Sequence, residues 1–169
     1  MRAVHDQVTI RFAQPGDVEV IYGLIVELAT YERAPEQVVG TPEMLARELF
    51  GERPSAEALI AEIDGEPVGF ALFHGTFSTW ECRAGIWLED LYVPPEHRRL
   101  GVGGKLLSEL AKITMQRGCA RLEWTALNWN TPALDFYAKV GAERMSDWSN
   151  HRLTGDALAR VAGQMGAAL

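Results

Sequence analysis

One strand, helix and strand unit constrains the fold more than any other part of the sequence. The run Ile86–Val93 is rich in β-favouring residues and ends at a pair of prolines. Residues 101–117 then carry apolar side chains at spacings of three and four, and Gly118 ends this helical pattern. Cys119–Leu127 is predicted to be the next strand. The usual right-handed crossover would make the two strands parallel, so the sheet should be mixed.

The same patterns place the remaining elements. Helix starts are indicated by Asp17 as a cap and by the pairs Thr41-Pro42 and Thr131-Pro132, and helix ends by the glycines that follow. A tight hairpin is indicated by Asp64-Gly65. The order is strand, two helices, three strands, helix, strand, helix, strand, and residues 1–169 suit one domain. The further strands are expected at Val8–Phe12, Leu59–Ile63, Pro67–Phe77 and Trp148–Leu153, and the further helices at 18–29, 41–50, Thr131–Gly141 and Thr154–Met165.

Composition excludes several classes of protein. The formal charge of -7 argues against a general nucleic-acid binder and suits a cationic substrate better, although acidic proteins are common. Cys82 and Cys119 are isolated and the four histidines are scattered, so no metal site is expected. Met1–Gln7 lacks the apolar core of a secretory signal, and the longest uncharged run, Pro67–Trp80, is too short to cross a bilayer. We therefore expect a cytoplasmic protein with no membrane contact.

A glycine-rich loop precedes the central helix. Glycines allow positive φ and close approach of a ligand, and the first amides of a helix have no internal partner, so this loop could bind a diphosphate. The basic side chains Arg98, Arg99 and Lys105 could add charge to the same anion. Taken alone, the spacing fits a simple strand-to-helix turn equally well. The segment is Arg98, Arg99, Leu100, Gly101, Val102, Gly103, Gly104 and Lys105.

Two motifs give these residues a familiar pattern. Arg98-x-x-Gly101-x-Gly103 resembles the Gln/Arg-x-x-Gly-x-Gly/Ala motif of the GNAT (Gcn5-related N-acetyltransferase) superfamily, and 130–142 resembles its Asn-x-x-x-x-x-Phe-Tyr-x-x-x-Gly segment. The chain is also similar to the diamine (spermidine/spermine) and thialysine acetyltransferase branch at 27–32, 78–80 and 88–93. The segment 81–87 departs from that branch.

The resemblance implies a fold and a function. The fold would be the α/β (α+β) GNAT fold, with a mixed, mostly antiparallel sheet of about six to seven strands and helices on both faces. The function would be transfer of an acetyl group from acetyl-CoA to a primary amine of a polyamine, thialysine or a lysine-like compound in a ternary complex, by a homodimer without a metal. The alternatives are an acetyltransferase of a protein amine or an aminoglycoside, and a non-catalytic acyl-CoA sensor on the same fold.

The resemblance also assigns cofactor and acid roles. Leu91, Tyr92 and Val93 would pair through their backbone with the pantetheine arm at an open strand edge. Tyr137 would lie near the CoA sulfur and act as general acid; the alternative is a tyrosine packed on the apolar face of its helix. Asn130 would position the cofactor, or it would only cap the following helix.

The acidic residues are assigned to the acceptor amine. Glu89 and Asp90 are adjacent in a strand, so they are expected on opposite faces, with at most one facing a given pocket. We expect Glu89 to take the amine proton and Asp90, Glu27 and Glu32 to anchor a cation, although solvated helix positions explain the last two as well. Trp80 would line the acceptor pocket or pack in a core or interface.

Overall fold

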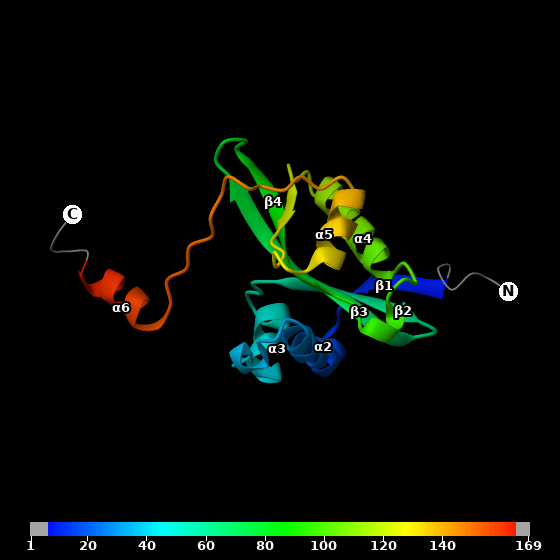
Figure 1. Cartoon of the computed structure of the whole chain (residues 1–169). Helices are drawn as coiled ribbons and strands as arrows, with labels where there is room; N and C mark the ends of the chain where they lie inside the picture. Colours follow the sequence, from blue (N-terminus) through cyan, green and yellow to red (C-terminus); the bar gives the residue numbers. More distant parts are fainter. Residues whose placement is uncertain (1–6, 165–169) are drawn as a thin grey trace. The chain divides into compact units, whose positions relative to one another are not determined.

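The computed structural model describes residues 7–164. They divide into two units at the boundary between Thr125 and Ala126. The first unit holds the sheet and the helices around it (Figure 1). The second holds α5 (Thr131–Lys139) and α6 (Gly155–Gln164). The predicted single domain stays a prediction. The terminal helix was expected to reach Met165, which lies outside the described residues. Residues 1–6 of the segment Met1–Gln7, where no secretory signal is expected, also lie outside them.

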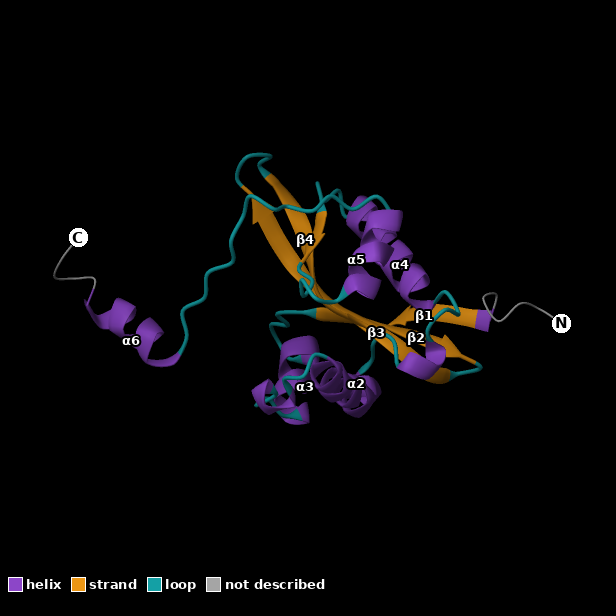
Figure 2. Cartoon of the chain, viewed as in Figure 1, coloured by secondary structure: helices purple, strands orange, loops and turns teal. Residues whose placement is uncertain are grey.

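A five-stranded sheet forms the centre of the first unit, in the order β1-β2-β3-β4-β5 (Figure 2). The neighbouring pairs are antiparallel except β4 and β5, which are parallel as predicted. The mixed, mostly antiparallel sheet is therefore confirmed, with five strands described instead of six to seven. The strands are β1 (Val8–Phe12), β2 (Glu57–Ile63), β3 (Glu66–Ser78), β4 (Arg83–Tyr92) and β5 (Leu122–Trp124).

The β2–β3 hairpin turns at Asp64 and Gly65, as the sequence predicts. Their φ angles are 53° and 85°, the left-handed conformation that both central residues of a type I′ turn require. Asp tolerates this region better than most residues and Gly adopts it without strain. The turn therefore fixes the register in which β2 and β3 pair.

Two predicted strands differ from the structure. Trp148–Leu153 is not a strand; its residues are exposed and join no ladder among the described residues. The strand expected at Cys119–Leu127 is reduced to Leu122–Trp124, which pairs only with Ile86–Leu88. Strand propensity depends on a partner that satisfies the backbone and packs the side chains, and composition alone does not supply one.

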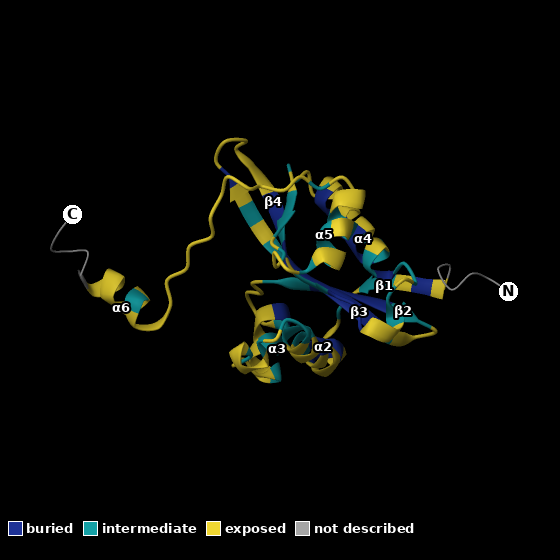
Figure 3. Cartoon of the chain, in the orientation of Figure 1, coloured by how far each residue is buried: buried dark blue, intermediate teal, exposed yellow. Residues whose placement is uncertain are grey.

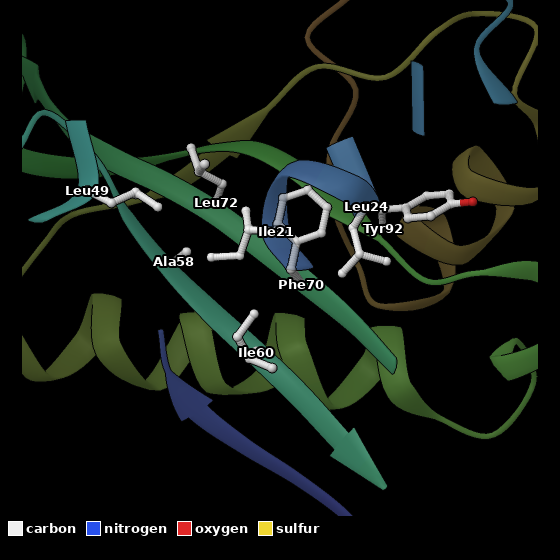
Figure 4. Close-up of a cluster of buried hydrophobic side chains, with 8 residues drawn as sticks. All are labelled: Ile21, Leu24, Leu49, Ala58, Ile60, Phe70, Leu72 and Tyr92. Atoms are coloured by element: carbon white, nitrogen blue, oxygen red, sulfur yellow. The ribbon is translucent and has the colours of Figure 1, made fainter. Parts of the chain in front are cut away.

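Helices cover both faces of the sheet. The helices α2 (Val18–Tyr31) and α3 (Pro42–Phe50) lie on one face, and α4 (Val102–Gln116) lies on the other (Figure 1). Consecutive residues are buried along the middle of β2 and of β3, so side chains on both faces of these strands are covered and each face has its own apolar layer (Figure 3). Each fully buried large side chain contributes ~1.5–3 kcal/mol. The layer under α2 and α3 contains Ile21, Leu24, Leu49, Ala58, Ile60, Phe70, Leu72 and Tyr92 (Figure 4).

The start of α2 is fixed differently from the prediction. Asp17 was expected to cap the helix, but its side chain makes no capping bond. Its carboxylate accepts two bonds from Arg11, at 2.6 and 2.8 Å, and one from the amide of Gln14 at 2.7 Å. Arg11 also donates to Glu62 at 2.8 Å. The Arg11 guanidinium lowers the pKa of Asp17, and this network ties β1 to the start of α2.

Gly69 allows the sheet to approach the head of α4. A Cβ at this position would lie 2.8 Å from the carbonyl oxygen of Tyr92 and 3.4 Å from a methyl group of Val102. Gly75, in the same strand, has nothing within 4 Å of its Cβ position. The two glycines therefore form a matched pair of crowded and open sites.

Gly69→Ala should lower the free energy of unfolding by about 1–3 kcal/mol, because backbone cannot move aside as a flexible side chain can. Gly75→Ala should be neutral or stabilising by up to about 1 kcal/mol. Denaturant unfolding of both variants measures the difference. Equal stabilities would contradict the close approach at Gly69.

Candidate active site

A β-bulge lies in β4 at Glu89. Leu72 of β3 pairs with Asp90 and the next residue, Phe73, pairs with Leu88, so Glu89 is the extra residue. Such a bulge bends the strand, increases its twist and changes the direction of a side chain. The strand thus departs from regular alternation at the position where the sequence predicts a catalytic carboxylate.

The bulge places both carboxylates on one face, contrary to the prediction that they face opposite sides. The indole Nε1 of Trp87 donates to Oε2 of Glu89 at 2.9 Å, so these two side chains share a face. Trp87 pairs with His74, which lies two residues from Leu72, the partner of Asp90. Glu89 and Asp90 therefore both lie on the α2 side of the sheet. The prediction was wrong because it assumed an unbroken period of two.

Asp90 is the most perturbed acid of this face. It is half-buried, and desolvation, with the charges of Glu89 and Glu32, raises its pKa from 3.8 to about 6. Burial also raises the pKa of Glu32, at the end of α2. The structure thus brings together three of the predicted substrate residues. A bound cation would relieve the repulsion among them.

The other two predicted substrate residues are not among the charges that act on Asp90. Glu27 is exposed on α2 and acts on Tyr92, whose hydroxyl pKa is raised first by burial and then by the charge of Glu27. Trp80 lies in the turn between β3 and β4 and is 86% exposed. It therefore does not pack in the core of the described unit, and its place in an acceptor pocket stays a prediction.

The strand β4 has an open edge beyond the bulge. The strand β5 pairs only with Ile86–Leu88, and no other described strand pairs with that side of β4. The predicted backbone positions Leu91, Tyr92 and Val93 follow on this stretch. Tyr92 and Val93 are buried, as expected of core side chains. The unpaired edge is the type of site to which an extended ligand can add as a strand would.

The glycine-rich loop leads directly into α4. Gly101 has a φ of 84° and Arg99 a φ of 63°, so the backbone turns twice through the left-handed region. The first helical bond runs from the amide of Lys105 to the carbonyl of Gly101 at 3.0 Å. The three preceding amides have no acceptor within the helix, and a Cβ on Gly104 would meet nothing within 4 Å.

The three basic residues predicted for this loop are not gathered on one anion site. The ammonium group of Lys105 donates to the carbonyl of Val8 at 2.9 Å. Arg98 donates through Nε to the carbonyl of Val93 at 2.9 Å, and its guanidinium lies 4.6 Å from the ring centre of Tyr31. Arg99 is the one of the three with no hydrogen bond or ion pair in the described structure. Arg98 and Lys105 are thus engaged by the framework, and the donors without a described acceptor in this loop are the first amides of α4 and Arg99.

The second unit holds the other two predicted site residues. Asn130 is the N-cap of α5, and its Oδ1 accepts from the amide of Ala133 at 3.4 Å. This capping bond supports the structural explanation for Asn130. Tyr137 is half-buried on α5, with its ring centre 5.3 Å from that of Phe136.

Sequence reasoning missed three residues of the site. Tyr31 packs on Arg98 from the end of α2, and its position four residues after Glu27 was a usable signal, because such residues share a helix face. Trp87 stands two residues before Glu89, which in a strand also indicates a shared face. His74 gave no signal, because its nearness to Glu89 depends on the β3–β4 register.

Comparison with known proteins identifies the family. The model of the acetyltransferase (GNAT) family matches residues 25–142. The chain belongs to the GNAT acetyltransferase family. It is 39% identical over 168 residues to thialysine N-epsilon-acetyltransferase of Bos taurus, covering 93% of this chain and 98% of that protein. It is 29% identical over 197 residues to L-ornithine N5-acetyltransferase of Arabidopsis thaliana, covering 90% of this chain and 86% of that protein.

A solved structure shows the same fold. An integron cassette protein of V. cholerae superposes with a TM-score of 0.77 at 26% identity, covering 92% of this chain and 98% of that one. The predicted superfamily, fold class and reaction class, transfer of acetyl from acetyl-CoA to an amine, are therefore confirmed for this GNAT chain. Among residues 7–164, no helix is long and apolar enough to cross a membrane, and no group of three or more potential ligands could hold a metal.

Asp90→Asn should stabilise this GNAT protein at high pH. The pKa of Asp90 is about 6 in the folded state and 3.8 when unperturbed. Between these pH values the folded state binds more protons than the unfolded state, so the protein loses stability as the pH rises through this range. At about pH 8 the variant should gain ~1–3 kcal/mol, and the gain should vanish below about pH 4.

Thermal unfolding across this pH range measures the effect, with the exposed Asp147→Asn as control. A gain that does not depend on pH would show that Asp90 is not a strained carboxylate.

Proposed function

We propose that this protein transfers the acetyl group of acetyl-CoA to a primary amine of a small cationic substrate, by direct attack in a ternary complex. The acceptor would be a polyamine, thialysine or a lysine-like amine. The observation that carries the proposal is the group of Glu32, Glu89 and Asp90 on one face of the bulged strand. Two of these acids, Glu32 and Asp90, are half-buried, and their charges are costly without a cation, which an alkylammonium ion supplies.

The head of α4 fits the diphosphate of acetyl-CoA. The amides of Val102, Gly103 and Gly104 have no acceptor within the helix, and the absence of side-chain atoms at Gly104 leaves room for a ligand. The positive end of the helix dipole favours an anion there, and Arg99 adds a charge. Gly101 and Leu100 shape the turn. Arg98 and Lys105 belong to the site as residues that hold its framework in place.

The edge of β4 fits the pantetheine arm. The amides and carbonyls of Leu91, Tyr92 and Val93 follow the bulge where β5 has stopped pairing. An arm bound along this edge would extend from the head of α4 toward Glu89. Acetyl-CoA supplies the thioester carbonyl that the amine attacks.

Proton transfer assigns the remaining roles. An alkylammonium ion must lose a proton before its nitrogen can attack, and Glu89 would take it directly or through one water. Asp90 and Glu32 would hold the rest of the cation, with Glu27 and Trp80 farther along the same substrate. Tyr137 would donate a proton to the departing thiolate, and Asn130 would hold the start of its helix. These roles for the second unit rest on the family resemblance.

The named relatives narrow the choice of amine. Thialysine and ornithine both carry a terminal amine on a flexible chain, which suits an acidic face better than a bulky rigid acceptor does. The competing functions are acetylation of a protein amine or an aminoglycoside and binding of acyl-CoA without turnover. The homodimer that the resemblance implies and the cytoplasmic location expected from the sequence remain part of the proposal, and analytical ultracentrifugation tests the dimer.

Thiol release from acetyl-CoA across a panel of polyamines, thialysine, ornithine, lysine, peptides and aminoglycosides tests the proposal. We expect saturable turnover with a small diamine or amino acid and little with peptides. Turnover confined to peptides or aminoglycosides would refute the substrate class. Acetyl-CoA binding without turnover on any amine would favour the sensor.

Gly104→Asp should weaken acetyl-CoA binding at least tenfold without harming the fold. The site is open, and an acid in the first turn stabilises a helix by ~0.3–1 kcal/mol, yet the same charge repels a diphosphate. Isothermal titration calorimetry measures the affinity. Gly104→Asn is the matched neutral control, and its affinity for acetyl-CoA should fall much less. Equal losses in both variants would indicate crowding instead of anion binding.

Tyr137→Phe should lower kcat by ~100-fold with little change in acetyl-CoA affinity, because only the proton for the leaving thiolate is removed. Steady-state kinetics at saturating acetyl-CoA measure it. Tyr22→Phe, which removes a hydroxyl bonded to the carbonyl of Gly40, is the control. Unchanged turnover in Tyr137→Phe would remove this residue from the mechanism.

A further inference from the structure

Glu89 is held by two side chains that the proposed mechanism does not use. The indole of Trp87 donates to Oε2 of Glu89 at 2.9 Å, and Nε2 of His74 lies 3.8 Å from the same oxygen. Trp87 and His74 are direct cross-strand partners in β4 and β3. Both contacts use Oε2, so Oε1 remains for an incoming amine.

The ring of His74 is oriented by a second contact. Its Nδ1 lies 3.2 Å from the carbonyl oxygen of Gly75, and a carbonyl can only accept, so Nδ1 carries the proton. In the neutral ring, Nε2 is then the unprotonated nitrogen, and it is the nitrogen that faces Glu89. The ring is therefore set to accept a proton on the side of the carboxylate.

Both groups also reach solvent. The side chain of His74 is 38% exposed and that of Glu89 is 56% exposed. A proton that moves from Glu89 to His74 can therefore continue to water. The gap of 3.8 Å requires a small side-chain rotation or one intervening water, which is within the range of proton transfer.

We propose that His74 accepts from Glu89 the proton that the amine substrate loses, and releases it to water. This inference rests on the proposed function, because it concerns the same Glu89. The alkylammonium ion gives its proton to the carboxylate and becomes a neutral amine. The carboxylic acid gives that proton to Nε2 and becomes a carboxylate again, and the imidazolium loses it to solvent. No electron is transferred and charge balances at each step.

Acidic side chains lie on the face of the sheet that holds His74. Glu89 and Asp90 lie on the same face, and Glu32 acts on Asp90 from the end of α2. Glu57 of β2 pairs with Phe73, is bound to Arg117 and lies on the opposite face of the sheet, so it does not face His74. The simpler explanation is an exposed ion pair of little energetic weight, which would leave kinetics unchanged.

His74→Gln should lower kcat/KM for the amine about tenfold and leave KM for acetyl-CoA unchanged. The expected loss is smaller than the ~100-fold or more that follows removal of a primary base, because His74 only assists Glu89. Added imidazole should restore the rate in proportion to its concentration, after subtraction of the enzyme-free reaction. The rate of the wild-type protein should not change when imidazole is added. His151→Gln, an exposed histidine in the second unit, is the control.

Each outcome decides the proposal. Wild-type kinetics in His74→Gln, or a loss that imidazole does not restore, would overturn the relay. Far-UV circular dichroism checks the fold, and His74→Asn repeats the test if His74→Gln does not fold. A wild type that acetylates no amine would instead refute the proposed function itself, so the two failures are distinguishable.

Discussion

The β-bulge at Glu89 is the constraint on which the site depends. One extra residue in β4 places Glu89 on the same face as Trp87 and Asp90, and the regular ladder with β3 resumes only at Asp90. The strand β5 pairs up to Leu88 and no further, so the edge of β4 opens where the bulge begins. Acid side chains and an unpaired backbone edge therefore start at one point in the strand.

The two ends of this strand have opposite electrostatic character. At the bulge, desolvation and neighbouring acids raise the pKa of Asp90 to about 6, which is a cost that the fold bears without a ligand. After β4, the chain turns through Arg99 and Gly101 and presents the positive end of α4. A cation fits the first end and a diphosphate fits the second. The strand between them is the connection that an acetyl donor and its acceptor require.

Sequence alone predicted the features that local physics controls. The apolar stripe of α4, the Asp64-Gly65 turn and the cap at Thr41, which accepts from the amide of Met44, all depend on residues close in the chain. The glycine loop was recognised through its spacing and its place before a helix. These signals sufficed for the fold class and the family.

The differences arise where tertiary contacts decide. The bulge is a property of the β3–β4 register, so the shared face of Glu89 and Asp90 was not visible in the pattern of either strand. Lys105 was assigned to the anion because it adjoins the glycines, but its side chain is long enough to reach the carbonyl of Val8 on β1. The strand expected at Trp148–Leu153 had the composition of a strand without a described partner.

A crystal structure of the protein with CoA and a diamine tests the central claim most directly. The account predicts the diphosphate on the amides of residues 102–104, the pantetheine arm along the β4 edge, and an amine nitrogen within hydrogen-bond distance of Glu89 on the face that holds Asp90. A diamine on the opposite face of the sheet, or CoA bound away from the head of α4, would contradict it.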